Sequence, residues 1–569
     1  MITATTSARH PAGANAAEKI GKERPPKGRL LPLDLPQGQQ VLAQDGYTDL
    51  VGARMFEFVN RHAPWHTALW GIGTALSLRE TIEYSDQVRG GSHNNDKGLA
   101  YVAESARKQV SGDPGAGPEE LRDAVLACLT DATVKTASGV DTLRHLTDRI
   151  EDGYMARLAT AVRTADPPGV EAIASFATAH MLDMGFSARF VHGWLRGLAA
   201  NDEVMHIGDV LDSAAALCLV PPRAFEVVIP FTSMPQGYPG QMPAGWLNSQ
   251  QTAELLDSFE PALTGDLRQA GSLHVTVTAR DPASAVENVA EDVAQAAARV
   301  AVGPRHGQLR PKSFGWVRGE SGDFPLRTRT RVELKSLKTS EQVFRLGGPD
   351  NAGAVYDALE IFAGLDSGTR GAELTSGWSA IEGLLLRSGE SPHALAADRL
   401  AAIVACAFPR AELTALSYRH TPPTDDALKA ALEGLDVNLE RCRIVEQAIR
   451  AGNSPHVASA SDRAMLRRVE GMIADPAGKL RNVERYVAES FRRLYTQRNL
   501  IMHAGSFQSV TLRATLRTAP KLVACGVDRV VASYMNSPPL DPVGLAARAA
   551  AELGLLGTPA ARQLCDLLE

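Results

Sequence analysis

Three polar residues near the end of one predicted helix have the types and the spacing for chemistry on a phosphate. In residues 485–505 (RYVAESFRRLYTQRNLIMHAG) an apolar stripe runs along the helix, and Arg498 falls within it. A guanidinium placed there is costly unless it meets an anion, a carboxylate or a subunit interface. His503 falls in the last turn, before a glycine, where the helix dipole favours an imidazolium that exchanges protons near neutral pH. Asn499, one turn before His503, can orient the imidazole or donate to a phosphate oxygen.

The spacing of an arginine five to seven residues before a histidine carries little information by itself. The chain has 14 histidines, so chance pairs are expected. In the other pairs the intervening residues include Pro, Gly or a strand-like stretch, whereas Arg498–His503 lies on an unbroken predicted helix. These other pairs are Arg61–His66, Arg268–His274, Arg299–His306, Arg387–His393 and Arg450–His456.

The segment RNLIMH, from Arg498 to His503, resembles the R-x(4–6)-H motif of the HEPN superfamily, with the polar residue after arginine that its ribonucleases usually carry. The flanking residues extend the likeness to L-Y-x-x-R-N-x-x-x-H-x-G, from Leu494 to Gly505. An earlier segment, WSAIEGLL at 378–385, resembles the W-x-A-x-E-x-L-L stretch of a preceding bundle helix. The likeness spans roughly residues 350–535 and implies an antiparallel helical bundle.

HEPN ribonucleases cut RNA without a metal, so the resemblance implies a metal-independent endoribonuclease with no cofactor and with 2′,3′-cyclic phosphate products. His503 would accept the 2′-OH proton or protonate the leaving 5′-oxygen, and Arg498 would neutralise the phosphorane. On a straight helix these two residues point about 140° apart. The family commonly joins two helix ends, so we expect a homodimer through the bundle, with Arg498 at or beside its two-fold axis.

Other side chains around the motif have weaker candidate roles. Asn499 joins Arg498 and His503 as a catalytic candidate, and Glu382 and Tyr495 are supporting candidates. Tyr495 suits packing better than catalysis, and Glu382 suits a surface or ion-pair carboxylate beside Trp378 better than an active-site role. A run of arginines is usually a solvated face, but here it is also placed to guide an RNA backbone. Its members are Arg481, Arg485, Arg492 and Arg493.

Two other functions stay open on the sequence alone. A catalytically silent HEPN bundle, acting as a nucleotide-binding or dimerisation scaffold, would pair Arg498 with an acid and use His503 as a helix cap. A helical adaptor would act through its N-terminal part instead. The sequence contains no P-loop, H-E-x-x-H motif or paired metal-ligand cluster, so an NTPase or a metallohydrolase has no support.

The elements that must position the motif are mainly α-helical. Helical periodicity begins near residue 48, gives way near 220 to short β-branched runs, and resumes after a Gly-rich break near 347. We predict a mainly α protein with an N-terminal helical domain, a small α+β middle domain and a C-terminal antiparallel HEPN bundle. The predicted boundaries are 1–44 for a disordered arm, 45–221 for the helical domain, 222–347 for the α+β domain, 348–540 for the bundle and 541–569 for a C-terminal helix.

Local signals define several elements within these domains. Strands are predicted at 225–231 and at 272–279, where apolar and polar residues alternate, and Asp281-Pro282 then supplies a cap and a first residue for a helix. Further strand-like pieces occur at 314–317 and 327–337, which favours helices on a mainly antiparallel sheet. The expected C-terminal helices are 352–363, 372–386, 394–408, 425–451, 461–474, 479–503 and 512–535.

The composition is that of a soluble protein with several domains. The chain has 569 residues, of which 44% are hydrophobic and 22% charged. A net charge of −6 excludes a wholly basic nucleic-acid coat protein but not a local basic groove. No strongly apolar run approaches the ~18 residues of a membrane span, and six scattered cysteines favour reduced core positions. We expect a cytoplasmic protein without membrane contact. Since large prokaryotic HEPN proteins often act as toxins or antiphage effectors, the resemblance also implies a trigger or regulator at the N-terminal domains.

Overall fold

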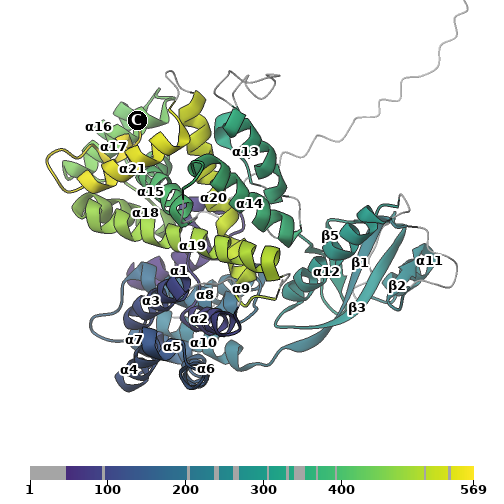
Figure 1. The fold of residues 1–569 in the computed structure, drawn as a ribbon. Helices are drawn as coiled ribbons and strands as arrows, with labels where there is room; N and C mark the ends of the chain where they lie inside the picture. The colour runs from purple at the N-terminus through teal and green to yellow at the C-terminus, as the bar shows by residue number, and fades with distance from the viewer. Residues whose placement is uncertain are drawn as a thin grey trace, which may run out of the picture. The chain divides into compact units, whose positions relative to one another are not determined.

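The computed structural model describes a mainly helical protein with a small antiparallel sheet in its middle region (Figure 1). Contacts divide the chain into residues 1–40 and 41–569, and every described residue belongs to the second unit. The predicted arm at 1–44 lies outside the described residues. Those described are 46–91, 96–200, 206–235, 243–259, 268–303, 307–327, 332–338, 353–366, 369–390, 394–504, 508–535 and 540–569.

The ten α-helices that the structure describes before the sheet, here called the N-terminal helices, bury one apolar cluster that runs from Val51 to Ala214. The sequence predicts one helix over 140–162, but the structure has two, because Gly153 adopts a left-handed φ of 75° between them. The helices are α1 Gly46–Val59, α2 Thr74–Arg89, α3 Asp96–Gly112, α4 Glu119–Cys128, α5 Asp131–Val134, α6 Ala137–Glu151, α7 Tyr154–Ala161, α8 Val170–Asp183, α9 Ala188–Ala199 and α10 Ile207–Leu219.

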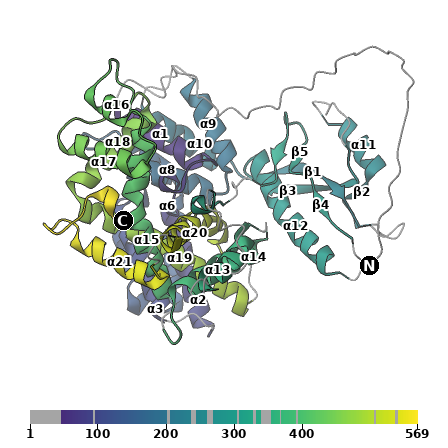
Figure 2. The ribbon, with the colours of Figure 1, turned by 90° about the horizontal axis from the view of Figure 1, so that it is seen from above.

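The middle region is an antiparallel sheet with strand order β2-β3-β1-β5-β6, and β4 also pairs with β1. Helix α12 begins as predicted, because the Asp281 carboxylate accepts from the Ser284 N–H at 2.8 Å. Its buried valines pack on the sheet, and α11 lies beside β2 (Figure 2). The elements are β1 Arg223–Ser233, β2 Trp246–Asn248, α11 Ser249–Asp257, β3 Gly271–Ala279, α12 Pro282–Val302, β4 Arg310–Pro311, β5 Phe314–Val317 and β6 Phe324–Pro325.

The predicted strand at 327–337 is wrong where the structure describes it. Residues Lys335–Leu337 form a 3₁₀ turn. Ser336 donates from its backbone N–H and its hydroxyl to Asp528, at 2.8 and 2.7 Å, while neighbouring leucines pack against the C-terminal core. The apolar residues of this segment therefore pack against the C-terminal core and do not form a strand of the sheet.

The remaining helices, here called the C-terminal helices, share a second large apolar cluster. The predicted helix at 425–451 is two helices, since Gly434 lies between them with a φ of 75°. The predicted C-terminal helix at 541–569 ends at Leu555. The helices are α13 Gly353–Ala363, α14 Arg370–Leu385, α15 Ala394–Ser417, α16 Ala427–Leu432, α17 Asn438–Arg450, α18 Ala460–Ala474, α19 Pro476–Ala504, α20 Leu512–Met535 and α21 Pro542–Leu555.

Helix α15 differs from the sequence predictions in two respects. It continues through Pro409 to Ser417 instead of ending at Phe408, which packing of its buried residues makes tolerable. Its 24 residues are also long and apolar enough to cross a membrane, and in the described chain it is the one helix that passes this test. However, 78% of its apolar window is buried inside the bundle, so a core position accounts for the composition. All six cysteines are free, and five of them are buried.

Candidate active site

The motif lies at the end of α19, a helix of 29 residues. Proline occupies its first position, and Asp475 just before it accepts from the Gly478 N–H at 2.9 Å. Arg498 and Asn499 fall in the last two turns and His503 in the final turn, as the sequence predicts. The His503 side chain and residues 505–507 lie outside the described part of the structure.

Arg498 is half-buried, and Phe491 and Leu494 of the apolar stripe on the same helix are buried. Its Nη1 donates to the Asn499 Oδ1 at 3.0 Å, so two of the three motif side chains contact each other. Its Nε is buried and, among the described residues, has no hydrogen-bond partner, as is also true of Arg485 and Arg492 on the same helix. A buried donor without an acceptor costs free energy, which an incoming phosphate oxygen would recover.

The helix with the tryptophan segment packs directly on the motif helix. Trp378 of α14 is fully buried, and its ring lies 4.8 Å from that of Tyr495. At Gly377 a Cβ would stand 3.6 Å from Leu494 and 2.9 Å from Leu365, so the missing side chain permits this close approach. The two segments that carry the HEPN resemblance are therefore in contact.

Glu382 lies further along α14, away from the motif. The Thr375 hydroxyl contacts the Met502 sulfur at 3.9 Å, and Trp378 contacts Tyr495, so α14 and α19 run antiparallel. At 1.5 Å per residue this offset places half-buried Glu382 about 10 Å from the level of Arg498 along the helix axes. The structure thus brings Tyr495 to the tryptophan but sets Glu382 at another level than Arg498.

The four arginines proposed to guide RNA have different surroundings. Arg481 is exposed and donates to its own helix at Ala477 O, and Arg485 lies over the Tyr486 ring at 4.7 Å. Arg492 pairs with Asp398 at 2.6 and 2.8 Å and lies over Tyr101. Arg493 is nearly buried and pairs with Glu80 at 2.8 Å. Two of the four guanidinium groups are therefore already neutralised by carboxylates.

Comparisons with protein-family models, curated proteins and solved structures find no match to this chain. The HEPN resemblance therefore rests on the motif residues themselves and on where the helices place them. In the described residues no group of three or more His, Cys, Asp or Glu is placed to hold a metal ion.

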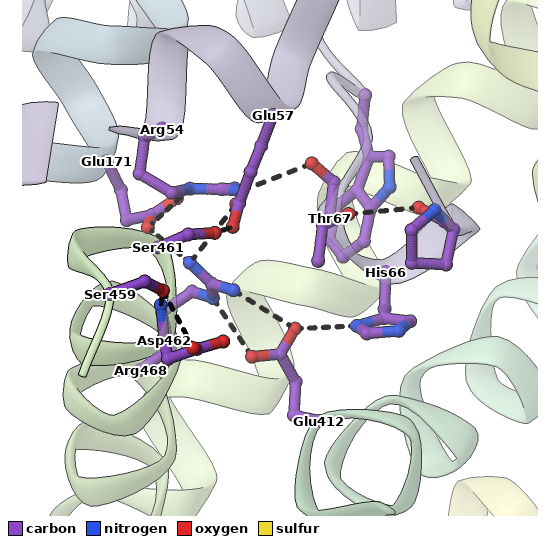
Figure 3. A network of polar contacts seen from close by, with 12 residues as sticks. Arg54, Glu57, His66, Thr67, Glu171, Glu412, Ser459, Ser461, Asp462 and Arg468 are labelled. Carbon is purple, nitrogen blue, oxygen red and sulfur yellow. Dashed lines mark hydrogen bonds and ion pairs between the residues drawn. The ribbon is translucent and has the colours of Figure 1, made fainter. Parts of the chain in front are cut away.

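A second polar constellation, the Glu412 cluster, lies away from the motif where α1 and α8 meet α15 and α18 (Figure 3). The fully buried Glu412 accepts from Arg468 Nε at 3.0 Å and contacts His66 Nδ1 at 2.8 Å. Burial by itself would raise the pKa of Glu412, but Arg468 and His66 outweigh it and lower that pKa to about 2.

Other charges complete the Glu412 cluster. Arg468 also reaches Glu171 at 3.2 Å and Glu57 at 3.9 Å, and Arg54 contacts both of these carboxylates. Figure 3 shows the two guanidinium groups enclosed by acids from both sets of helices. Each charged group has an oppositely charged partner within 4 Å. The cluster therefore holds the helices together and is not an open binding site.

Sequence reasoning missed the residues that cover the other face of α19. Glu80 of α2 pairs with Arg493 of α19, and Glu83 of α2 accepts from Ser509, which in turn accepts from Gln497. The available signal was weak: Ser490, Arg493 and Gln497 recur at helical spacing on a face distinct from the apolar stripe. Such a polar stripe is typical of a solvated face, and its burial depends on a helix some 400 residues away in the chain.

Proposed function

We propose that this protein is a metal-independent endoribonuclease of the HEPN type, with Arg498, Asn499 and His503 at its active site. One observation carries the proposal: the R-N-x-x-x-H segment ends a long helix that packs, through Tyr495 on Trp378, against the helix with the W-x-A-x-E-x-L-L segment. Each segment is a short pattern, and their contact within one set of packed helices is much less expected by chance than either alone.

The proposed reaction uses the ribose 2′-OH as the nucleophile. A bond forms from O2′ to phosphorus and the bond from phosphorus to O5′ breaks, which leaves a 2′,3′-cyclic phosphate and a 5′-OH. His503 accepts the 2′-OH proton or protonates the leaving O5′, a role favoured at a helix C-terminus, where the dipole supports the imidazolium. Arg498 neutralises the crowded phosphorane through charge-assisted hydrogen bonds, while Asn499 orients the guanidinium through its contact with Nη1.

A complete site in this proposal needs two helix ends. Because Arg498 and His503 point about 140° apart on one helix, a homodimer through the C-terminal helices supplies the missing group. The RNA backbone follows the two arginines that have no carboxylate partner among the described ion pairs, Arg481 and Arg485. The protein acts in the cytoplasm as a regulated toxin or antiphage effector, and its N-terminal helices and middle sheet respond to the trigger.

One observation favours a second candidate, a catalytically silent HEPN bundle that serves as a nucleotide-binding or dimerisation scaffold. Arg492 and Arg493 are engaged by Asp398 and Glu80, which is how a structural helix would use them. In that case His503→Ala would leave function intact, while Arg498→Ala would lower stability.

RNA cleavage by the purified protein in EDTA tests the proposal. Arg498→Ala and His503→Ala are each expected to lower the cleavage rate by about 100-fold or more, because each removes a group that acts in the transition state. Arg467→Ala, at an exposed arginine of the neighbouring helix α18, should keep the wild-type rate. Equal rates in all four proteins would contradict the proposal.

A further inference from the structure

Helix α19 has a second buried face besides its apolar stripe. Ser490 and Gln497 are 3% and 2% exposed, and the side chain of Arg493, between them on the same face, is 10% exposed. The Ser490 hydroxyl donates to Trp70 O at 3.1 Å. This face is covered by α2 and by the segment that precedes it, so the N-terminal helices reach the motif helix itself.

The side-chain amide of Gln497 ties the end of α19 to the segment that leads into α20. Its Nε2 donates to the Ser509 Oγ at 2.7 Å and to the Thr511 Oγ1 at 3.0 Å. Residues 498–508, which include Arg498, Asn499 and His503, lie between the two ends of this tie. Gln497 therefore links the last turns of α19 to the residues at the start of α20.

Two chains of hydrogen bonds lead from Gln497, through a hydroxyl each, to two carboxylates of α2. The Ser509 hydroxyl donates to Glu83 Oε2 at 2.8 Å, and the Thr511 hydroxyl donates to Glu80 Oε1 at 3.4 Å. Arg493 Nε donates to the same Glu80 oxygen at 2.8 Å. Each hydroxyl accepts one hydrogen bond from the amide and donates one to a carboxylate, so both chains of hydrogen bonds run in one direction.

The residues joined in this way are here called the Gln497 cluster, and disrupting their contacts is costly because most of them are buried. They are Glu80, Glu83, Arg493, Gln497, Ser509 and Thr511. Ser509 is 8% exposed, Thr511 is fully buried and Glu80 is 7% exposed. A buried polar group that loses its partner pays the full cost of its desolvation. The end of α19 and the start of α20 are thus held in one arrangement by α2.

We infer that Gln497, Glu80 and Glu83 are positioning residues, through which α2 fixes the end of α19 for the proposed ribonuclease site. This inference rests on the proposed function. It makes the N-terminal helices part of the scaffold of the site, in addition to any regulatory role. Separation of the C-terminal helices from α2 would then leave the motif without its support.

The test compares variants that break the tie with one that breaks another contact between the same two sets of helices. Gln497→Met keeps the length and helix propensity of the side chain but removes both donated hydrogen bonds. Ser509→Ala combined with Thr511→Val removes both acceptors and should match it. The control is Arg463→Gln, which removes the 3.4 Å contact with Asp49 on α1 and touches α18, not α19.

We expect Gln497→Met and the double variant to lower kcat by about 10- to 100-fold with KM nearly unchanged, since binding survives while geometry is lost. Hydrogen exchange of the amides at 498–504 should rise by about tenfold or more in both. Arg463→Gln should change neither quantity. Unchanged exchange in the tie variants, or faster exchange with wild-type kcat, would overturn the inference.

The two proposals fail in different ways. If the wild-type protein cleaves no RNA, the proposed function is wrong, and hydrogen exchange alone then decides whether α2 holds the end of α19. If the wild-type protein cleaves RNA but the tie variants behave like Arg463→Gln, the positioning role is wrong and the ribonuclease proposal stands.

Discussion

Two polar clusters join the N-terminal helices to the C-terminal helices, and they shift the pKa of a glutamate in opposite directions. In the Glu412 cluster Arg468 and His66 lower the pKa of Glu412 to about 2. In the Gln497 cluster burial raises the pKa of Glu83, and nearby Glu80 adds to this effect, against the hydrogen bonds from Ser509 and Val510. The first cluster is a set of connected ion pairs suited to stability, whereas the second is a directed hydrogen-bond network beside the motif.

The arginine–carboxylate pairs between the two sets of helices share one direction of charge. In five described pairs the N-terminal helices supply the acid and the C-terminal helices the arginine. At these contacts the N-terminal helices thus present acids and the C-terminal helices present arginines. The pairs are Asp49–Arg463, Glu57–Arg468, Glu171–Arg468, Glu80–Arg493 and Asp183–Arg517.

Removal of the central guanidinium should break the Glu412 cluster and give the largest loss of stability. Arg468→Met leaves Glu412 buried with only His66 beside it, so we expect the free energy of unfolding to fall by about 3–5 kcal/mol. Chemical denaturation measures this change. Arg467→Met, at the exposed neighbouring position, should stay within about 0.5 kcal/mol of the wild type. Equal losses for both variants would contradict the stabilising role of the cluster.

Acid should weaken the Glu412 cluster over a defined pH window. The folded pKa of about 2 lies below the ordinary 4.5, so the stabilisation is complete above pH 4.5 and is lost as the pH falls towards 2. The shift corresponds to about 3 kcal/mol. Unfolding measured from pH 5 to pH 2 should be less pH-dependent in Glu412→Gln than in the wild type. Identical slopes would show that Glu412 is not held in its charged form.

Glu83 should respond to pH with the opposite sign and a smaller effect. Its folded pKa is raised, so the folded state holds the proton more tightly and stability falls as the pH rises above 4.5. Glu83→Gln removes the poorly solvated charge and keeps an acceptor for Ser509. Its unfolding free energy at pH 8 should equal or slightly exceed that of the wild type, within about 1 kcal/mol. A large loss at pH 8 would mean that the charge itself is needed.

Local signals in the sequence predicted much of this fold. The Asp281 cap, the start of α12 and the two-residue alternation of β3 are properties of neighbouring residues and were predicted correctly. The breaks at Gly153 and Gly434 were missed because helical periodicity continues across them, although the backbone turns there.

The candidate site was predictable only in part, for a similar reason. The placement of Arg498 and His503 at the end of α19 follows from residues close in sequence. The contact of Arg493 with Glu80 joins residues 413 positions apart, and nothing near either residue indicates it. Partners of that kind decide whether an arginine on α19 faces RNA or a carboxylate, and a single sequence does not encode them in a readable pattern.

The chemistry of the RNA ends tests the central claim most directly. A defined single-stranded RNA is incubated in EDTA with the wild-type protein or with Arg498→Ala, after thermal unfolding has confirmed that both are folded. The proposal predicts fragments with 2′,3′-cyclic phosphate and 5′-OH ends from the wild type, and none above background from Arg498→Ala. No cleavage by the wild type, or the same cyclic ends from a folded Arg498→Ala protein, would contradict it.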